Sequence, residues 1–195
     1  MSQDEFTTIT DKVGEGFYSE KRSKFLAFAH HVVTAEEVKT IIDNYRKKYY
    51  DARHVCYAYM LGPERSVFRA NDDGEPGSTA GKPILGQINS NGLTDILIVV
   101  VRYYGGVNLG TGGLIVAYRS AAADSISHCD TVVRQVEETI TYHYAYPLMN
   151  DVMRIVKEMS PRIVSQSFDN TCSITLAIRK SMAPQLKDRL QKLSF

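Results

Sequence analysis

The sequence has no tryptophan, only three cysteines and no long hydrophobic run. The cysteines are widely spaced, which excludes a disulfide framework and a paired-cysteine metal motif; they are Cys56, Cys129 and Cys172. The longest apolar run, Ile96–Val101, is far shorter than the roughly 20 residues of a membrane helix, and the first residues lack an apolar signal segment. These absences predict a soluble, cytoplasmic protein with no membrane partner.

The sequence also lacks an excess of charge of either sign. It contains 23 Lys and Arg against 22 Asp and Glu, a formal net charge of +1. A protein that binds nucleic acid through its overall electrostatic field is therefore not expected. Any such binding has to come from a local basic patch.

Hydrophobic patterns predict the elements of the first two thirds of the chain. Thr34 and Glu37 form a capping box before a helix over 35–48. The uninterrupted apolar, β-branched run Ile96–Val101 is typical of a strand buried on both faces. Residues 68–80 read as a polar, glycine-rich loop. The other expected elements are strands over Thr7–Val13, Ser23–Val33 and His54–Leu61, a short helical segment over Ile84–Ile88, and a helix from Leu114 onward.

A domain boundary is predicted between residues 134 and 135, which divides the chain into domains of residues 1–134 and 135–195. The second domain reads as a βαββα order typical of a ferredoxin-like fold that lacks its last strand. Either its sheet has three strands, or Leu193–Phe195 begins a fourth. Asp169 and Asn170 are a hairpin-turn signal. The expected elements are strand Glu138–Tyr146, helix Leu148–Glu158, strands Arg162–Phe168 and Thr171–Arg179, and helix Ala183–Lys192.

A cluster of glycines follows the buried strand and precedes a helix. Such a corner presents free backbone N–H groups, and Arg102 adds a positive charge, so the sequence predicts an anion-binding site. The alternative is a tight turn that glycine alone permits. The spacing is not a dinucleotide-binding fingerprint. The expected contacts are Arg102, Gly105, Gly106, Gly110, Gly112 and Gly113, with Lys24, Arg53 and Lys82 as supporting charge.

A second polar group lies in the loop between residues 71 and 82. Its GSTAGK stretch departs from a phosphate-binding loop, because its glycine spacing is too short and Pro83 replaces the Ser or Thr. Its carboxylates are candidate metal ligands or acid–base groups, or simply a solvated lid, and no metal is predicted. His54 and Cys56 lie roughly 7 Å apart on one strand face, too far for a direct hydrogen bond. The candidate residues are His54, Asp72, Asp73, Glu75 and Thr79.

Basic and aromatic residues on neighbouring strands are a third feature. Cations that bind phosphate and rings that stack on bases are what single-stranded RNA binding uses. The alternative is a solvated charge run with core tyrosines. The residues concerned are Lys21, Arg22, Lys24, Arg53, Tyr57, Tyr59, Tyr103 and Tyr104.

Four ordered motifs together resemble the IMPACT/YigZ family. They are KRSKF (21–25), HVCYAY (54–59), NDDGEP with TAGKPIL (71–85), and RYYGG through LG to GGL and AY (102–118). The resemblance implies an α+β protein. Its N-terminal domain would be an α/β sandwich similar to the second domain of a small-subunit ribosomal protein, and its C-terminal domain would be similar to the last domain of elongation factor G.

The resemblance further implies a translation-associated regulator that binds RNA, the ribosome or a translation factor, with no cofactor and no transferable catalytic activity. Eukaryotic relatives act in the amino-acid-starvation stress response, but through a partner-binding domain that this sequence lacks. The alternative from the residues is an enzyme that binds a small phosphorylated or carboxylated ligand between loops 71–82 and 105–113. A protein-interaction scaffold is the third possibility. The residues predict no particular oligomeric state.

Overall fold

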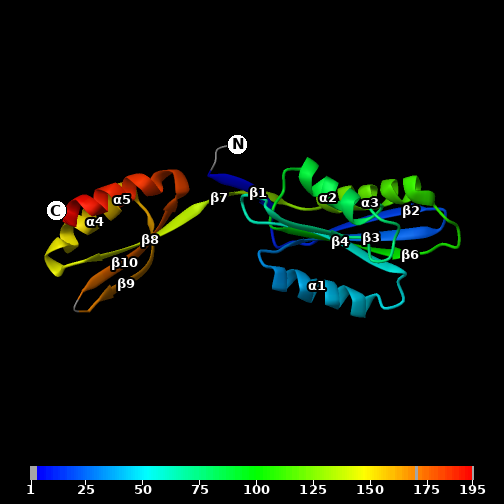
Figure 1. Ribbon diagram of the computed structural model, residues 1–195, viewed down its shortest axis with the longest axis horizontal. Coiled ribbons are helices and arrows are strands. Elements are labelled where there is room, and N and C mark those ends of the chain that lie inside the picture. The colour runs from blue at the N-terminus through cyan, green and yellow to red at the C-terminus, as the bar shows by residue number, and fades with distance from the viewer. Residues whose placement is uncertain (1–3, 170, 195) are drawn as a thin grey trace. The chain divides into compact units, whose positions relative to one another are not determined.

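The structure is a computed structural model that describes residues 4–169 and 171–194. The chain divides into two compact units. One consists of residues 6–134, and the other joins Asp4 and Glu5 to the chain from Gln135 onward. Each unit packs helices on an antiparallel sheet, so the expected α+β class is confirmed (Figure 1).

The first unit is built on a five-stranded sheet with helices on both faces. Helix α1 (Ala35–Lys48) covers one face, and α2 (Gly81–Ser90) and α3 (Gly110–Ser127) cover the other (Figure 1). The strand order is β2-β3-β6-β4-β5, and all neighbours are antiparallel. The strands are β2 (Gly14–Glu20), β3 (Ser23–His31), β4 (His54–Leu61), β5 (Val67–Asn71) and β6 (Ile96–Tyr103).

The central strand β6 separates two hydrophobic cores. Leu97, Val99 and Val101 pack on the α1 side. Ile96, Ile98 and Val100 pack on the side of α2 and α3. All six residues are 0% exposed. The apolar run is therefore continuous because both faces of the strand are covered, although the sheet is antiparallel.

The predicted capping box of α1 is confirmed. Thr34 Oγ1 accepts the Glu37 N–H at 3.2 Å, and Glu37 Oε2 accepts the N–H of Thr34 at 3.2 Å and of Val33 at 2.7 Å. These two backbone donors hold the pKa of the Glu37 carboxyl below its ordinary value. Local sequence therefore specifies where this helix begins.

Three strands were missed by the sequence patterns, and one was displaced. The strand expected over Thr7–Val13 is β1 (Glu5–Ile9), which pairs with β7 (Thr131–Gln135) in a two-stranded sheet. Strand β2 contains two glycines and β5 is exposed at the sheet edge, so neither shows clear alternation. Strand β7 is also mostly exposed, and it lies where the sequence predicts the domain boundary.

Helix α3 lies directly against the backbone of β2, and this contact explains the glycines in that strand. A Cβ at Gly16 would lie 2.3 Å from Ser125 N and 2.6 Å from Ala121 O. A Cβ at Gly14 would lie 2.3 Å from Ser125 O. Only glycine permits this approach, which holds α3 in place beside the sheet.

The second unit has the predicted βαββα order. Its three strands pair antiparallel in the order β8-β10-β9, and helices α4 and α5 contribute to one core with them. Its elements are β8 (Glu137–Tyr144), α4 (Met149–Met159), β9 (Arg162–Phe168), β10 (Cys172–Arg179) and α5 (Ala183–Gln191), with 3-10 turns at Tyr146–Leu148, Lys180–Met182 and Lys192–Ser194.

Two details of that unit differ from the expectation or fall outside the structure. Residues Lys192–Ser194 form a 3-10 turn, so within the described residues no fourth strand begins after α5. The predicted hairpin turn includes Asn170, which lies outside the described residues, as does Phe195.

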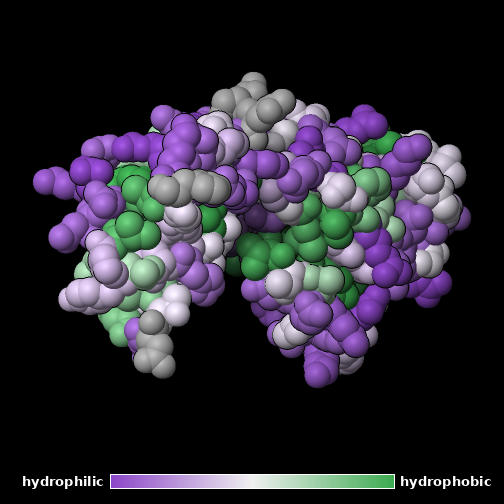
Figure 2. Space-filling model, turned by 60° about the vertical axis from the view of Figure 1, so that its left-hand side comes forward, coloured by the Kyte–Doolittle hydropathy of each residue, from purple (hydrophilic) through white to green (hydrophobic). Residues whose placement is uncertain are grey.

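The face shown in Figure 2 is mainly hydrophilic, with hydrophobic areas between the polar side chains. Most large apolar side chains are in the three cores, and scattered exposed ones are ordinary for a folded protein. No helix within residues 4–169 and 171–194 is long and apolar enough to cross a membrane.

Candidate anion-binding site

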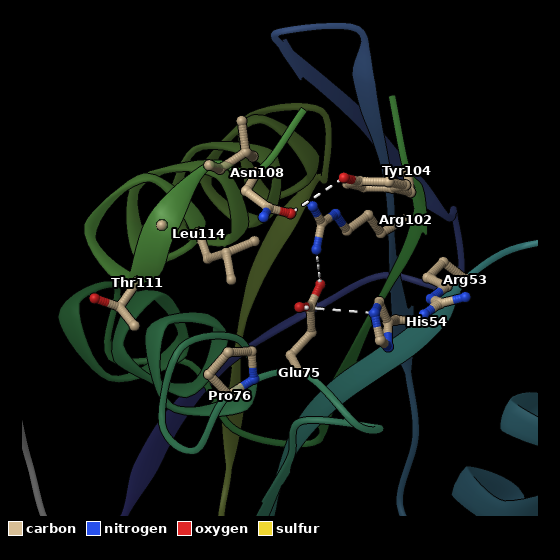
Figure 3. A pocket seen from close by; sticks show the side chains of 11 residues that line it. Arg53, His54, Glu75, Pro76, Arg102, Tyr104, Asn108, Thr111 and Leu114 are labelled. Carbon is tan, nitrogen blue, oxygen red and sulfur yellow. Dashed lines mark hydrogen bonds and ion pairs between the residues drawn. The ribbon is translucent and has the colours of Figure 1, made fainter. Parts of the chain in front are cut away.

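A cavity of about 500 Å³ lies in the first unit, where the end of β6 and the start of β4 meet the amino end of α3 (Figure 3). Its size suits a ligand as large as a nucleotide. The residues that line it are Arg53, His54, Glu75, Pro76, Arg102, Tyr104, Asn108, Leu109, Gly110, Thr111 and Leu114.

Strand pairing brings the first two polar side chains together. His54 of β4 is the register partner of Arg102 of β6. Paired residues of antiparallel strands project from the same face, and this face is the one covered by α2 and α3. Sequence-distant residues thus become neighbours through register alone.

The loop before α2 delivers Glu75 to the same place, and Asp72 fixes its shape. The Asp72 carboxylate accepts backbone N–H groups from Ser78 at 2.9 Å, Ala80 at 3.1 Å and Gly81 at 2.8 Å. These bonds, to residues six to nine positions further along the chain, fold the loop back on itself. Glu75 is held inside the loop and is 8% exposed.

Glu75 is the centre of a buried hydrogen-bond network. Its Oε1 accepts Arg102 Nη1 at 2.5 Å and the Tyr118 hydroxyl at 2.6 Å. Burial raises the pKa of Tyr118, and its contacts with Cys56 and Glu75 raise it further, so the phenol keeps its proton and donates it. The charge of Arg102 is therefore compensated by Glu75 within the protein.

The Arg102 guanidinium lies between two aromatic rings. Its carbon is 5.5 Å from the Phe25 ring centre and 5.6 Å from that of Tyr104. Arg102 is only 5% exposed, and its Nε has no hydrogen-bond partner in the described part of the chain. This Nε has almost no accessible surface, so it is an unsatisfied donor inside the protein and not a direct contact for a ligand in the cavity.

His54 is oriented by the backbone of the same loop. Its Nδ1 lies 2.7 Å from Asp73 O, and because a carbonyl only accepts, Nδ1 carries a proton. In the neutral imidazole, Nε2 is then an acceptor, and it faces Glu75 Oε2 at 3.7 Å. Figure 3 shows both His54 and Arg102 directed at Glu75. Two acceptors facing each other create a place for a ligand that donates hydrogen bonds.

Two further parts of the cavity wall are electropositive: Arg53, which lies beside His54, and the start of α3 near Thr111, which lies across from them (Figure 3). Arg53 is exposed, and none of the described acidic side chains pairs with it. Helix α3 begins at Gly110 with no side-chain cap from Leu109, so its first N–H groups are free to bind an anion. Gly110 has a φ of +71°, which favours glycine at this position.

The structure brings together five of the fourteen site residues that the sequence predicted. Arg53, His54, Glu75, Arg102 and Gly110 line the cavity. Other predicted residues do not line it: Lys24, Lys82, Asp72, Asp73, Thr79, Gly105, Gly106, Gly112 and Gly113.

The glycine cluster is partly a packing feature and partly the helix itself. A Cβ at Gly105 would lie 2.2 Å from the Arg22 carbonyl carbon, so this glycine permits contact with the β2–β3 turn. Gly112 and Gly113 lie inside the first turn of α3 and not in a loop. The tight-turn interpretation therefore holds for Gly105, whereas anion binding stays a prediction, now centred on Gly110 at the start of α3.

The remaining polar side chains of the acidic loop make structural contacts within the loop and with β4 and α1. Asp73 accepts the Val55 N–H at 2.7 Å and pairs with Arg46 at 3.6 Å, and Thr79 donates to Pro76 O at 2.5 Å. Among the residues that the structure describes, no cluster of three His, Cys, Asp or Glu side chains is arranged to hold a metal.

Cys56 is a buried hydrogen-bonded thiol. Its Sγ donates to Asp72 O at 3.0 Å and contacts the Tyr118 hydroxyl at 3.4 Å. Burial raises its pKa, which keeps it from acting as a thiolate at neutral pH. His54 bonds to Asp73 instead, so the two side chains are engaged with different partners.

The predicted basic and aromatic surface is divided by the sheet. Tyr57, Tyr59 and Tyr103 belong to the α1 side, whereas Tyr104 lies at the rim of the cavity. Sequence reasoning missed Asn108, Thr111 and the role of Tyr118. The first two occur within the glycine cluster, which is the signal that pointed there, while Tyr118 has the spacing of an ordinary core residue.

Fold and cavity together define an α+β protein with a polar cavity in its larger unit. The model of the Impact N-terminal domain matches residues 21–126, more than half of the chain, and this segment contains every residue of the cavity. The chain therefore belongs to the IMPACT family, as the four motifs indicated.

Individual relatives cover the chain to different extents. The IMPACT family member YigZ of Escherichia coli (strain K12) is 30% identical over 176 residues, 89% of this chain and 86% of the relative. The family member YvyE of Bacillus subtilis (strain 168) is 38% identical over 116 residues, which are 60% of this chain and 54% of the relative. A crystal structure of a hypothetical protein, 26% identical, has a TM-score of 0.75 over 98% of this chain and 93% of its own.

Proposed function

We propose that this protein is a cytoplasmic, translation-associated regulator that binds single-stranded RNA, with a backbone phosphate at the amino end of α3. One observation carries the proposal. The cavity combines Arg53, an exposed arginine with no ion-pair partner among the described residues, with the free N–H groups of a helix start. Phosphate is the group that such donors bind best.

The association with translation is supported by family membership and by the resemblance of both domains to ribosome-bound proteins. Fold analogy is a weaker argument than site chemistry, so the ribosome or a translation factor is proposed as the context and RNA as the ligand. The net positive charge of the pocket fits this ligand. Glu75 compensates Arg102, and Arg53 with the helix start supplies the remainder.

The test is RNA affinity measured against salt concentration with the full chain. Wild type should show a falling log–log dependence, and Arg53→Gln should bind more weakly with a slope smaller by roughly 0.7 per lost phosphate contact. Lys47→Gln is the matched control, because Lys47 is an exposed cation on α1, on the opposite face of the sheet. A flat dependence for wild type would contradict the proposal. Co-sedimentation of the wild-type chain with ribosomes tests the translational context.

A second candidate is an enzyme acting on a small phosphorylated or carboxylated ligand. The observation in its favour is that His54 Nε2 and Glu75 Oε2 face each other at 3.7 Å in the cavity. A panel of phosphate monoesters and carboxylates, with and without Mg²⁺, should then raise the melting temperature by mass action. Absence of any shift, together with RNA binding, would exclude this candidate.

A further inference from the structure

We infer that the cavity recognises the 3′-terminal nucleotide of RNA, through the free ribose cis-diol that only a chain end carries. The inference rests on the proposed RNA-binding function and specifies its ligand. A nucleotide has three chemically distinct parts, and the cavity offers a different kind of surface to each of them.

The acceptor pair His54 Nε2 and Glu75 Oε2 fits the two hydroxyl groups of the ribose. Glu75 Oε1 is already occupied by Arg102 and Tyr118, whereas Oε2 has no hydrogen-bond donor among the described residues. His54 Nδ1 is fixed on Asp73 O, so Nε2 is directed at the same point. With Nε2 unprotonated, two acceptors face each other at 3.7 Å, and vicinal hydroxyls supply one donor to each.

The rim of the cavity fits a base. Tyr104 is 47% exposed, and its ring is backed by the Arg102 guanidinium at 5.6 Å, which fixes the plane of the ring. Its hydroxyl donates to Asn108 Oδ1 at 3.1 Å, which fixes its direction as well. A rigid, exposed ring next to a positively charged pocket is the arrangement on which single-stranded bases stack.

Arg53 and the start of α3 fit the phosphate on the 5′ side of that nucleotide. Arg53 and the start of α3 at Gly110 lie in the same cavity as the acceptor pair and the ring. A nucleotide inside the chain has its 3′ oxygen esterified, so it offers one donor fewer and places a second phosphate beside the Glu75 carboxylate. The pocket is therefore expected to exclude internal nucleotides.

The test compares single-stranded RNA oligomers of about eight nucleotides that differ only at the 3′ end. The ends are a free cis-diol, a 3′-phosphate and a 2′,3′-dideoxy nucleotide, and all three are titrated into the unmodified full-length protein. Loss of hydrogen bonds to charged groups predicts at least about tenfold weaker binding of both altered ends. Equal affinity for all three ends would overturn the inference and leave RNA binding intact, whereas no binding at all would overturn both.

A second arm uses variants and a free nucleotide. Tyr104→Leu should weaken binding of all three oligomers about tenfold, because they share the lost stacking contact, whereas Tyr50→Leu, at an 85% exposed tyrosine that does not line the cavity, should leave binding unchanged. Free adenosine monophosphate carries the same cis-diol, base and 5′ phosphate, so it should compete, but more weakly than the oligomer, whose further phosphates add electrostatic attraction. Competition equal to that of the oligomer would assign the site to a free nucleotide and overturn the RNA-end assignment.

Discussion

Arg102 and Glu75 form an ion pair at 2.5 Å in which both side chains are more than nine-tenths buried. The desolvation cost of such a pair is high, so its net contribution to stability is small, but either partner left alone is strongly destabilising. A pair of this kind at the wall of a cavity holds two functional side chains in fixed positions.

Replacement of Arg102 alone should strongly destabilise the protein. Arg102→Met leaves the Glu75 carboxylate buried without its cation and is expected to lower the free energy of unfolding by about 3–5 kcal/mol in urea titrations. The double variant Arg102→Met with Glu75→Gln should lose clearly less than the sum of the single changes. Lys12→Met, at the exposed Lys12–Asp130 pair, is the control, with an expected loss under about 1 kcal/mol. A loss that small for Arg102→Met would contradict the buried ion pair.

The hydroxyl of Tyr118 should stabilise the fold through Glu75. Tyr118→Phe removes the donor at 2.6 Å from Oε1 and is expected to cost about 1.5–3 kcal/mol, the range for hydrogen bonds to charged groups. Tyr18→Phe is the matched control, because the Tyr18 hydroxyl contacts the exposed Glu20 at 3.3 Å. Thermal or chemical denaturation measures both, and equal small effects would show that the Tyr118 bond contributes nothing.

The contact between α3 and β2 should make Gly16 sensitive to a single methyl group. Gly16→Ala places a Cβ within 2.3 Å of Ser125 N, a backbone atom, and is expected to destabilise the protein by about 1–3 kcal/mol or more. Gly86→Ala is the opposite case, because nothing lies within 4 Å of its Cβ and Gly86 is inside α2. It should stabilise by about 0.5–1 kcal/mol. Denaturation midpoints of the two variants should therefore move in opposite directions.

Protonation of His30 should account for part of the decrease in the free energy of unfolding at low pH. Its Nε2 lies 2.6 Å from the Tyr45 hydroxyl. Burial lowers the pKa of His30 and raises that of Tyr45, so the tyrosine donates to a neutral imidazole. The unfolded chain takes up a proton near pH 6.5, before the folded one does, so this contribution is complete above about pH 6.5 and is lost as the pH falls below it.

The measurement is the free energy of unfolding at about pH 7.5 and about pH 5. His30→Gln should lose less stability between the two pH values than wild type. His143→Gln, at an exposed position in β8, should follow wild type. If His30→Gln and wild type lose the same amount, His30 is not a source of the acid sensitivity.

Local patterns in the sequence determined much of the fold. Thr34 and Glu37 start α1 because a capping box needs only neighbouring residues. The apolar run Ile96–Val101 identified the doubly covered central strand, and hydrophobic periodicity with Pro and turn signals gave the βαββα order of the second unit. Strands β2, β5 and β7 were missed because their glycines or exposure remove the alternation that marks a strand.

The candidate site was decided by tertiary structure. The sequence indicated Arg102, Arg53 and the glycine corner, but which carboxylate joins them depends on long-range contacts. Asp72 pins the loop by backbone bonds, so Glu75 alone of its acidic residues lines the cavity, and Tyr118 reaches it from a helix position typical of a core residue. Local propensity cannot specify hydrogen bonds between residues 27 or 43 positions apart. Strand register and loop closure specify them, and both arise only when the sheet and its helices pack together.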